Sequence, residues 1–237
     1  MILDPRSVPV WRVDNDLPPV AAERLQPDAL RARFARPPAW RPEVVQEPRF
    51  SQRPPAQAAV LLAIVPRGPD GSAPTVLLTQ RTQHLSTHSG QIAFPGGKRD
   101  DTDASLEATA LRETHEEIGL HPRHVDVVGS LPVYVTGTAF EVTPVVGLIR
   151  PGFELQPNAD EVDAVFEVPL DFLMNPAHHR RHQFEWEGRQ RQWFSMPYLE
   201  QLADADEGQS PVERFIWGAT AGMLRNFYRF LAADPMP

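Results

Sequence analysis

Three glutamates on one predicted helix have the residue type and the spacing of a site for a divalent cation. Glu113, Glu116 and Glu117 stand at positions i, i+3 and i+4, which project from neighbouring points on the same side of an α-helix. Carboxylates placed in this way repel one another, and a hard cation with oxygen ligands, such as Mg²⁺ or Mn²⁺, removes that repulsion. This face of the helix can therefore hold a metal ion.

The same helix has a second face that is suited to packing. Leu111, Thr114 and Ile118 fall together on it, so they can anchor the helix on a hydrophobic core. Gly119 follows, and glycine is a frequent residue just beyond the end of a helix. Helix faces rich in glutamate are also common on solvated surfaces, so the three carboxylates alone leave a surface interpretation open.

Residues around the glutamates strengthen the metal interpretation. A turn at Gly96-Gly97 and an acidic loop precede the helix, Arg112 stands directly before the first glutamate, and Gly119-Leu120 follows the last. Together they resemble the Nudix box, the signature of hydrolases that cleave a nucleoside diphosphate linked to another group. The resemblance implies an α/β (α+β) fold, with a mixed β-sheet sandwiched between α-helices, and a Mg²⁺ or Mn²⁺ cofactor.

The loop of the box departs from the usual spacing, which is a glycine, five residues, a glutamate, seven residues and then Arg-Glu. Counting back from Arg112 puts Lys98 at the glycine position and Ala104 at the glutamate position, so this chain has one extra residue between Gly97 and Arg112. Asp103 is the candidate replacement for the glutamate, and a loop of different shape is the alternative.

A second motif lies directly upstream of the box. It begins with Leu77-Leu78-Thr79-Gln80-Arg81 and ends in Phe94-Pro95-Gly96-Gly97. It resembles the additional signature of coenzyme A pyrophosphatases, a Nudix subfamily that cuts coenzyme A or its acyl derivatives into 3′,5′-ADP and 4′-phosphopantetheine. Thr82 stands where the subfamily usually has serine or alanine, and Ser86 stands where it usually has arginine. Ser86 therefore removes one expected contact to an anion.

The Nudix resemblance implies a role for each residue of the site. Arg112 would orient the glutamates, although its i+4 spacing to Glu116 also suits a purely structural salt bridge. A backbone carbonyl of the glycine turn completes the metal shell in the family. The general base is a box glutamate or a carboxylate from a later loop, for which Glu161 is a candidate, with a solvated loop acid as the alternative. The expected residues are catalytic Arg112, Glu113, Glu116 and Glu117, metal-binding Glu113, Glu116, Glu117 and Gly97, and substrate-binding Arg81, Gly96, Gly97 and Lys98.

Other residues of suitable type are interpreted as structural. His178, His179 and His182 lie beside arginines in a polar segment, which indicates a solvated surface rather than a metal site. His115 points away from the three glutamates on the predicted helix. Aromatic residues could stack on a base, but packing is the usual role of such side chains, here Trp186, Trp193 and Phe194.

Composition limits the class of protein. The chain has 237 residues, 41% of them hydrophobic, and shows neither an apolar run that could cross a bilayer nor a secretory leader, so we expect a cytoplasmic protein with one core. It has no cysteine, which excludes disulfides, a thiolate nucleophile and cysteine-ligated metals. A net charge of −8 argues against broad nucleic-acid binding. A polyanionic substrate must then be met by local positive charge, from metal ions, Arg81, Lys98 and Arg99, with a solvated turn as the alternative interpretation of Lys98 and Arg99.

The elements that must position the site can be placed along the chain. Residues 1–55 are rich in proline and predict an arm with one short helix at Asp28–Arg36, followed by a single domain at 56–237. Apolar runs predict strands at Ala58–Val65, Thr75–Arg81, Gln91–Phe94, Val125–Val128, Val142–Ile149 and Val162–Val168. Pro144 favours an edge position or a bulge for the strand that contains it.

The last part of the chain predicts mixed structure. We expect a short helix at Leu170–Leu173 and a hairpin from Gln183 to Phe194 that turns at Glu187-Gly188. Ser210-Pro211-Val212-Glu213 has the pattern of a helix start, and apolar residues from Val212 to Leu231 recur at helical spacing. This predicts a core-packing C-terminal helix, with a homodimer interface as the alternative.

Two other classes of function stay open. One is a Nudix hydrolase of another specificity, acting on ADP-ribose, NADH or a nucleoside triphosphate, and the motif from Arg81 to Gly97 argues against it. The other is a non-catalytic ligand-binding module that keeps the fold, and such a module has no need of all three glutamates.

Overall fold

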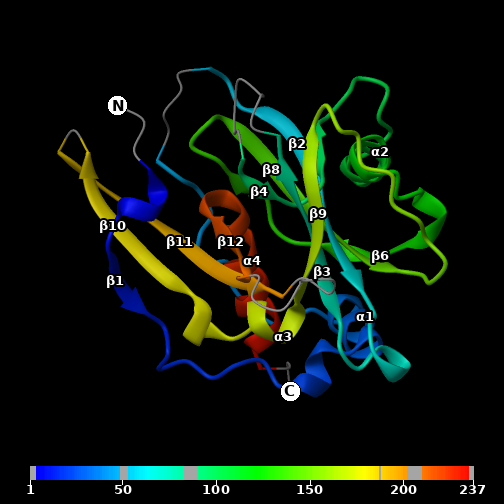
Figure 1. Cartoon of the computed structure of the whole chain (residues 1–237), viewed down its shortest axis with the longest axis horizontal. Helices are drawn as coiled ribbons and strands as arrows, with labels where there is room; N and C mark the ends of the chain where they lie inside the picture. Colours follow the sequence, from blue (N-terminus) through cyan, green and yellow to red (C-terminus); the bar gives the residue numbers. More distant parts are fainter. Residues whose placement is uncertain (1–3, 49–52, 83–89, 187, 202–209, 235–237) are drawn as a thin grey trace.

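The computed structural model describes residues 4–48, 53–82, 90–186, 188–201 and 210–234. Their strands form a larger and a smaller sheet, with the C-terminal helix α4 (Gly218–Ala232) packed between them (Figure 1). Within these ranges, no helix is long and apolar enough to cross a membrane.

The larger sheet is mixed, because β2 and β8 pair in parallel whereas its other pairs are antiparallel. Neighbours run in the order β4-β3-β2-β8-β6, with β5 against β2, β7 against β8 and β9 against β3. The strands are β2 (Ala56–Val65), β3 (Thr75–Arg81), β4 (Ile92–Ala93), β5 (Gly96–Lys98), β6 (Val125–Ser130), β7 (Tyr134–Val135), β8 (Phe140–Ile149) and β9 (Val162–Pro169). The six apolar runs thus predicted their strands correctly, to within a few residues at the ends.

Pro144 lies in a central strand, so the preference for an edge was wrong. Strand β8 has β2 on one side and both β6 and β7 on the other. The partner on that second side changes close to Pro144, since Val145 pairs with Ser130 of β6 and Val142 pairs with Tyr134 of β7. The missing N–H of proline therefore falls where this ladder is interrupted, which removes the cost that confines proline to edges.

Helix α2 (Leu106–Ile118) covers one face of the larger sheet, as predicted (Figure 1). The Ser105 hydroxyl oxygen accepts a hydrogen bond from the Ala108 N–H at the start of the helix, and Gly119 ends it with φ 73°. The apolar side of α2 forms one hydrophobic cluster with inward residues of β2 and β8. This packing holds the helix that carries the three glutamates.

The opposite face of the larger sheet packs on α4, α1 (Pro27–Ala35) and α3 (Leu170–Leu173). The sheet is therefore sandwiched between helices, which confirms the predicted fold class. Single 3₁₀ turns lie at Pro5–Ser7, Ala22–Leu25, Pro69–Gly71, Pro122–His124 and Pro176–His178.

The smaller sheet is antiparallel and runs in the order β1-β10-β11-β12. Its strands are β1 (Val10–Val13), β10 (Arg180–Trp186), β11 (Arg189–Glu200) and β12 (Val212–Trp217). Strands β10 and β11 form the predicted hairpin. The predicted start of the C-terminal helix was wrong, because β12 pairs along its whole length with β11 and α4 begins only at Gly218.

The N-terminal segment packs against the rest of the molecule rather than extending as an arm. Val20, Leu25 and Leu30 are buried in the same core as α4, and β1 pairs with β10. The Phe34 ring of α1 lies 4.7 Å from the Phe230 ring of α4. Proline-rich composition limits hydrogen-bonded elements but does not prevent side chains from packing. The domain boundary at residue 56 stays a prediction.

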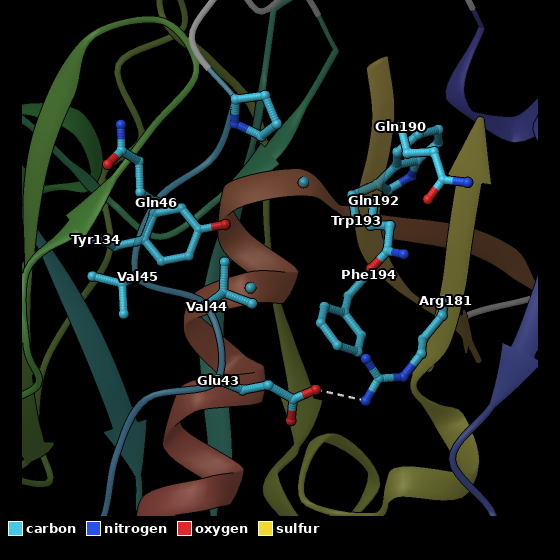
Figure 2. Close-up of a pocket in the computed structure, with 13 residues that line it drawn as sticks. Glu43, Val44, Val45, Gln46, Tyr134, Arg181, Gln190, Gln192, Trp193 and Phe194 are labelled. Atoms are coloured by element: carbon cyan, nitrogen blue, oxygen red, sulfur yellow. Dashed lines mark hydrogen bonds and ion pairs between the residues drawn. The ribbon is translucent and has the colours of Figure 1, made fainter. Parts of the chain in front are cut away.

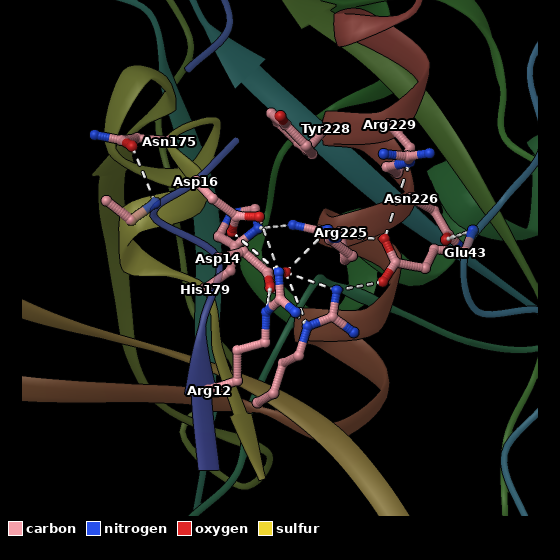
Figure 3. Close-up of polar contacts among 12 residues, drawn as sticks. Arg12, Asp14, Asp16, Glu43, Asn175, His179, Arg225, Asn226, Tyr228 and Arg229 are labelled. Carbon is pink, nitrogen blue, oxygen red and sulfur yellow. Dashed lines mark hydrogen bonds and ion pairs between the residues drawn. The ribbon is translucent and has the colours of Figure 1, made fainter. Parts of the chain in front are cut away.

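A buried cluster of charges joins the N-terminal segment to α4 and β10 (Figure 3). Asp14 lies 2.7 Å from Arg181 and 3.0 Å from Arg225, and Glu43 lies 2.6 Å and 2.7 Å from the same two arginines. Burial acts to raise the pKa of both carboxyls, but the arginines outweigh it and hold each pKa below its usual value. Removing one partner would leave a buried charge uncompensated, so these pairs bind the segment firmly.

Candidate metal and catalytic site

Glu117 is the most buried of the three glutamates, with a side chain that is 6% exposed. Its Oε2 accepts a hydrogen bond from the Gly96 N–H at 3.1 Å, and its Oε1 lies 3.4 Å from Arg81 Nη1. Burial, with Glu161 and Glu113 nearby, raises the pKa of Glu117 to about 7, although the Gly96 bond and Arg81 act in the opposite direction. The charge on this carboxylate is therefore incompletely compensated.

Glu113 lies against the second glycine of the turn. A Cβ atom at Gly97 would stand 2.4 Å from Glu113 Oε2, so the carboxylate has room there only because residue 97 is glycine. Burial raises the pKa of Glu113, and the charges of Glu116 and Glu161 add to this, against the effect of Arg112. Glu116 is the outer member, with 57% of its side chain exposed. The three carboxylates thus range from buried to solvated.

Asp103 takes the place beside Arg112. Its two carboxylate oxygens accept hydrogen bonds from Arg112 Nε at 2.9 Å and Nη2 at 2.8 Å. Asp103 Oδ2 also accepts from the Asp100 N–H and the Thr109 hydroxyl, each at 2.9 Å. The Arg112 bond holds the pKa of Asp103 well below its usual value, followed by the bond from the Asp100 N–H. The loop is longer than the usual box, yet it still places a carboxylate on the arginine.

Arg112 also bridges two of the glutamates. Its Nη1 lies 2.9 Å from Glu113 Oε1 and 2.9 Å from Glu116 Oε2. In the described ranges, no three His, Asp or Glu side chains are gathered closely enough to hold a metal ion. The donor chemistry nevertheless fits a hard cation, because two of the carboxylates are partly buried with raised pKa values. A bound Mg²⁺ or Mn²⁺ would compete with Arg112 for Glu113 and Glu116.

The predicted glycine turn at Gly96-Gly97 is in fact the start of strand β5, since both residues pair with β2, and it holds the helix and sheet close together. Gly96 has φ 147°, and a Cβ atom there would stand 2.4 Å from the Ala59 carbonyl oxygen, so glycine is required. In β5, Gly97 pairs with Ala59 and Lys98 pairs with Ala58. Since side chains alternate along a strand, Lys98 extends from the sheet face opposite to α2, away from the glutamates. A role for Lys98 in substrate binding stays a prediction.

Both ends of the upstream motif reach the site, Arg81 from the end of β3 and Gly96-Gly97 from β5. Arg81, at the end of β3, pairs with Glu117, while Ser86, in the middle of the motif, lies outside the described residues. The neighbouring Thr82 N–H donates to the carbonyl of Glu161 at 3.1 Å. Glu161 therefore lies on the side of the glutamates, and its charge contributes to the raised pKa of Glu113 and Glu117.

The arrangement of box helix, glycine turn and mixed sheet matches a known family. The NUDIX domain model matches residues 56–214. The chain belongs to the Nudix family. It is similar to a protein named as an uncharacterized Nudix hydrolase, NudL, of Shigella flexneri serotype 5b (strain 8401), with 41% identity over 196 residues, 82% of this chain and 91% of that protein. The protein of the same name from Salmonella heidelberg (strain SL476) is 40% identical over 213 residues, 90% of this chain and 98% of that one.

Solved structures of Nudix proteins are similar to part of the chain. One is a Nudix hydrolase from M. smegmatis, RenU, which has 28% sequence identity and a TM-score of 0.42. The match covers 50% of this chain and 73% of that chain.

Asn158 lies beside the Nudix glutamates, and neither sequence motif includes it. Asn158 donates its backbone N–H to the carbonyl of Glu117 at 2.9 Å, and its side chain contacts Glu161 and the N–H of Asp160. Asn-Ala-Asp is a frequent turn pattern, in which the asparagine oxygen accepts an N–H two residues later. That pattern could have indicated a structured turn before β9.

The prediction of a solvated histidine cluster was wrong. His179 and His182 are buried, and His178 is partly buried with its ring stacked on Phe172 at 4.0 Å. The reason is that the N-terminal segment covers this side of β10, so that His182 Nδ1 lies 2.8 Å from the carbonyl of Val8. The ring of His115 is exposed and lies against that of His121, 5.3 Å away.

Phe194 and Trp193 of the hairpin serve packing, as predicted, whereas the side chain of Trp186 lies outside the described part of the chain. Phe194 belongs to the core, and the Trp193 ring stacks on His182 at 5.4 Å. A cavity of about 400 Å³ lies between segment 43–48, the hairpin and the start of α4. Figure 2 shows Tyr134 on one side of this cavity, with Arg181 and Phe194 on the other. Its described lining includes no residue of α2 or of the glycine turn, so the Nudix glutamates lie outside it.

Proposed function

We propose that the protein is a metal-dependent pyrophosphatase that hydrolyses the diphosphate bond of coenzyme A or its acyl derivatives. The observation that best supports this reaction is the pair of partly buried carboxylates of Glu113 and Glu117. Both lie against Gly96-Gly97, and burial raises the pKa of both. Keeping both of these partly buried carboxylates ionised costs free energy unless a cation binds to them. Nudix hydrolases generally use divalent metals such as Mg²⁺ or Mn²⁺.

Each box residue then has a defined task. Glu113, Glu116 and Glu117 would hold the cation, together with the carbonyl oxygen of Gly97. When bound, such a cation activates water and offsets the negative charge that grows on the diphosphate oxygens. Arg112, held by the carboxylate of neighbouring Asp103, orients Glu113 and Glu116.

The hydrolysis needs a proton acceptor. Water adds to one phosphorus atom, the bridging P–O bond breaks, and the proton that the water loses passes to a carboxylate. Glu161 and a box glutamate are the candidates for this acceptor. Glu161 is favoured because its charge influences the pKa values of Glu113 and Glu117, and because it comes from the loop before β9 rather than from α2.

The substrate assignment depends on the second motif. The sequence from Leu77 to Arg81, with Phe94-Pro95-Gly96-Gly97, resembles the signature of coenzyme A pyrophosphatases. Arg81 lies beside Glu117, where a guanidinium can contact a phosphate. ADP-ribose, NADH and nucleoside triphosphates are the alternative substrates.

The test is a hydrolysis screen of coenzyme A, ADP-ribose, NADH and nucleoside triphosphates with Mg²⁺ and with Mn²⁺. The Glu117→Gln variant is measured in parallel. The matched control is Glu107→Gln, which removes an exposed carboxylate from the first turn of the same helix. We expect metal-dependent release of 3′,5′-ADP, a loss of at least ~100-fold in Glu117→Gln and no loss in the control.

The outcomes separate the alternatives. Turnover of another nucleotide with the same dependence on Glu117 would keep the reaction and refute the coenzyme A assignment. Absence of turnover with every substrate would refute the enzyme and favour a ligand-binding module.

A further inference from the structure

The loop before β9 is attached to the last turn of α2. The Gln156 N–H donates to the carbonyl of Ile118 at 2.8 Å, and the Asn158 N–H donates to the carbonyl of Glu117 at 2.9 Å. Carbonyls at the end of a helix lack partners within the helix, so these bonds both cap α2 and locate the loop. The backbone of Asn158 is thus fixed to that of Glu117.

Asn158 also builds the turn that carries Glu161. Its carbonyl accepts hydrogen bonds from the N–H groups of Glu161 at 3.0 Å and Val162 at 2.8 Å. Its side-chain oxygen accepts from the Asp160 N–H at 3.1 Å, and its Nδ2 donates to Glu161 Oε1 at 3.4 Å. One residue therefore contacts both the backbone of the turn and the carboxylate at its end.

A second attachment fixes the other side of the turn. The Thr82 N–H donates to the carbonyl of Glu161 at 3.1 Å, and the Thr82 hydroxyl donates to that of Asp160 at 3.3 Å. Arg81, the residue before Thr82, pairs with Glu117. Two separate connections thus bring Glu161 beside Glu117, one through Asn158 and one through the end of β3. The influence of Glu161 on the pKa of Glu117 agrees with this placement.

We propose that Asn158 is a positioning residue, which holds the carboxylate of Glu161 toward Glu113 and Glu117. The inference rests on the proposed function, in which these carboxylates serve metal-dependent hydrolysis. Asn158 touches neither substrate nor metal and acts through Glu161. Its site lies in the loop before β9, outside the box and the upstream motif.

Asparagine suits this position because the position uses both an acceptor and a donor. The acceptor closes the turn at Asp160, and the donor contacts Glu161. Aspartate at residue 158 would keep the acceptor, but it would replace the donor by a second negative charge next to Glu161. Alanine would remove both groups.

The test is a double-mutant cycle between Asn158→Ala and Glu161→Gln, with Asn158→Asp as a second variant that keeps the turn. The matched control is Asn175→Ala, because Asn175 also accepts an N–H two residues on, from Ala177 at 3.1 Å, at the start of a 3₁₀ turn before β10. The measurements are kcat and KM for the best substrate, and the dissociation constant of Mn²⁺ from the electron paramagnetic resonance signal of the free ion.

We expect kcat to fall by about 100-fold in Glu161→Gln, because this variant loses the proton acceptor. In Asn158→Ala and Asn158→Asp, kcat should fall by about 10-fold. KM should change by less than about 3-fold in all three variants. The double variant Asn158→Ala/Glu161→Gln should match Glu161→Gln alone, because Asn158 acts through Glu161. Mn²⁺ binding should weaken several-fold in Asn158→Ala and in Glu161→Gln, again without additivity in the double variant, because the first displaces a nearby negative charge and the second removes it. Asn175→Ala should behave as the wild type.

Two results would overturn the proposal. If the fold-decreases in kcat of the two single variants multiply in the double variant, Asn158 acts independently of Glu161. If kcat is unchanged in Asn158→Ala, Asn158 only shapes the loop. If the wild type hydrolyses no substrate, the proposed function fails, and the Mn²⁺ affinities decide the positioning role by the same comparison.

Discussion

Lowering the pH should destabilise the fold through His179, which is fully buried. Arg225 Nη1 lies 3.1 Å from His179 Nδ1 and can only donate, so the ring proton sits on Nε2, which donates to the Leu173 carbonyl at 2.8 Å. A second proton would have to enter at Nδ1, where it would displace Arg225 and stand beside its positive charge. Burial lowers the pKa of His179 to about 4, and Arg225 adds to this effect.

The sign and size follow from that pKa. An unfolded histidine gains its proton below about pH 6.5, whereas His179 in the folded protein gains it only near pH 4, so the unfolded state binds more protons between these values. The free energy of unfolding therefore falls as the pH drops through this window, by about 2 to 3 kcal/mol between pH 7.5 and 4.5. Above pH 7.5 this contribution is constant.

The assay is urea unfolding at a series of pH values for the wild type and His179→Gln. Glu117, whose pKa burial raises to about 7, has the opposite dependence, so the informative quantity is the difference between the two proteins. Asp14 and Glu43, whose pKa values are lowered, change charge mainly below the window. We expect the stability advantage of the wild type over His179→Gln to shrink by about 2 to 3 kcal/mol from pH 7.5 to 4.5.

A matched control tests whether the effect belongs to the buried ring. Asn175→Ala changes no titratable group in the 3₁₀ turn just before His179, so its stability difference from the wild type should stay constant with pH to within about 0.5 kcal/mol. Parallel curves for the wild type and His179→Gln would refute the reasoning, because they would mean that His179 takes up its proton equally in both states.

Three further results are expected. Glu117→Gln should raise the free energy of unfolding by about 1 to 3 kcal/mol at pH 8 in the presence of a chelator. Burial raises the pKa of Glu117 to about 7, so the charged carboxylate destabilises the folded protein at pH 8 but is neutralised at low pH. The gain should therefore disappear near pH 4.5. Gly97→Ala should lower kcat by about 10- to 100-fold in the hydrolysis assay while thermal unfolding stays nearly unchanged, because the three atoms nearest to the new Cβ all belong to the carboxylate at the end of the Glu113 side chain. Leu30→Ala should destabilise the protein by about 2 to 5 kcal/mol in urea, since Leu30 is fully buried, and no loss of stability would mean that α1 folds apart from the core.

Local pattern was sufficient for the strands of the larger sheet and for α2, but not for the start of α4. The sequence Ser210-Pro211-Val212-Glu213 has the pattern of a helix start, and the apolar residues that follow recur at helical spacing. Val212–Trp217 nevertheless form strand β12. What decides the outcome is pairing with β11, for example Met196 with Ile216, a contact that no local window contains. Tertiary pairing outweighed a modest local propensity.

Long-range contacts also explain the error over the histidines. The segment around His179 and His182 is polar, which favours a solvated surface when it is considered alone. In the folded chain, Asp14 and Glu43 reach it from far upstream and neutralise Arg181, so the polar segment can be buried. A sequence shows which residues are charged, whereas the pairing that allows burial depends on the fold.

In the candidate site too, the sequence spacing predicts which residues share a helix face, whereas packing against the sheet decides how buried each one is. The i, i+3, i+4 pattern correctly put Glu113, Glu116 and Glu117 on α2, but spacing makes these three carboxylates nearly equivalent. The sheet makes them unequal, because the turn at Gly96-Gly97 approaches one edge of the helix and leaves the other to solvent. Among the described residues, Glu117 is the only one of the three to accept a hydrogen bond from a backbone N–H, which it does in a buried position, whereas Glu116 stays hydrated. The carboxylate that most needs a compensating cation is therefore that of Glu117, at the buried end of the site beside Gly96-Gly97.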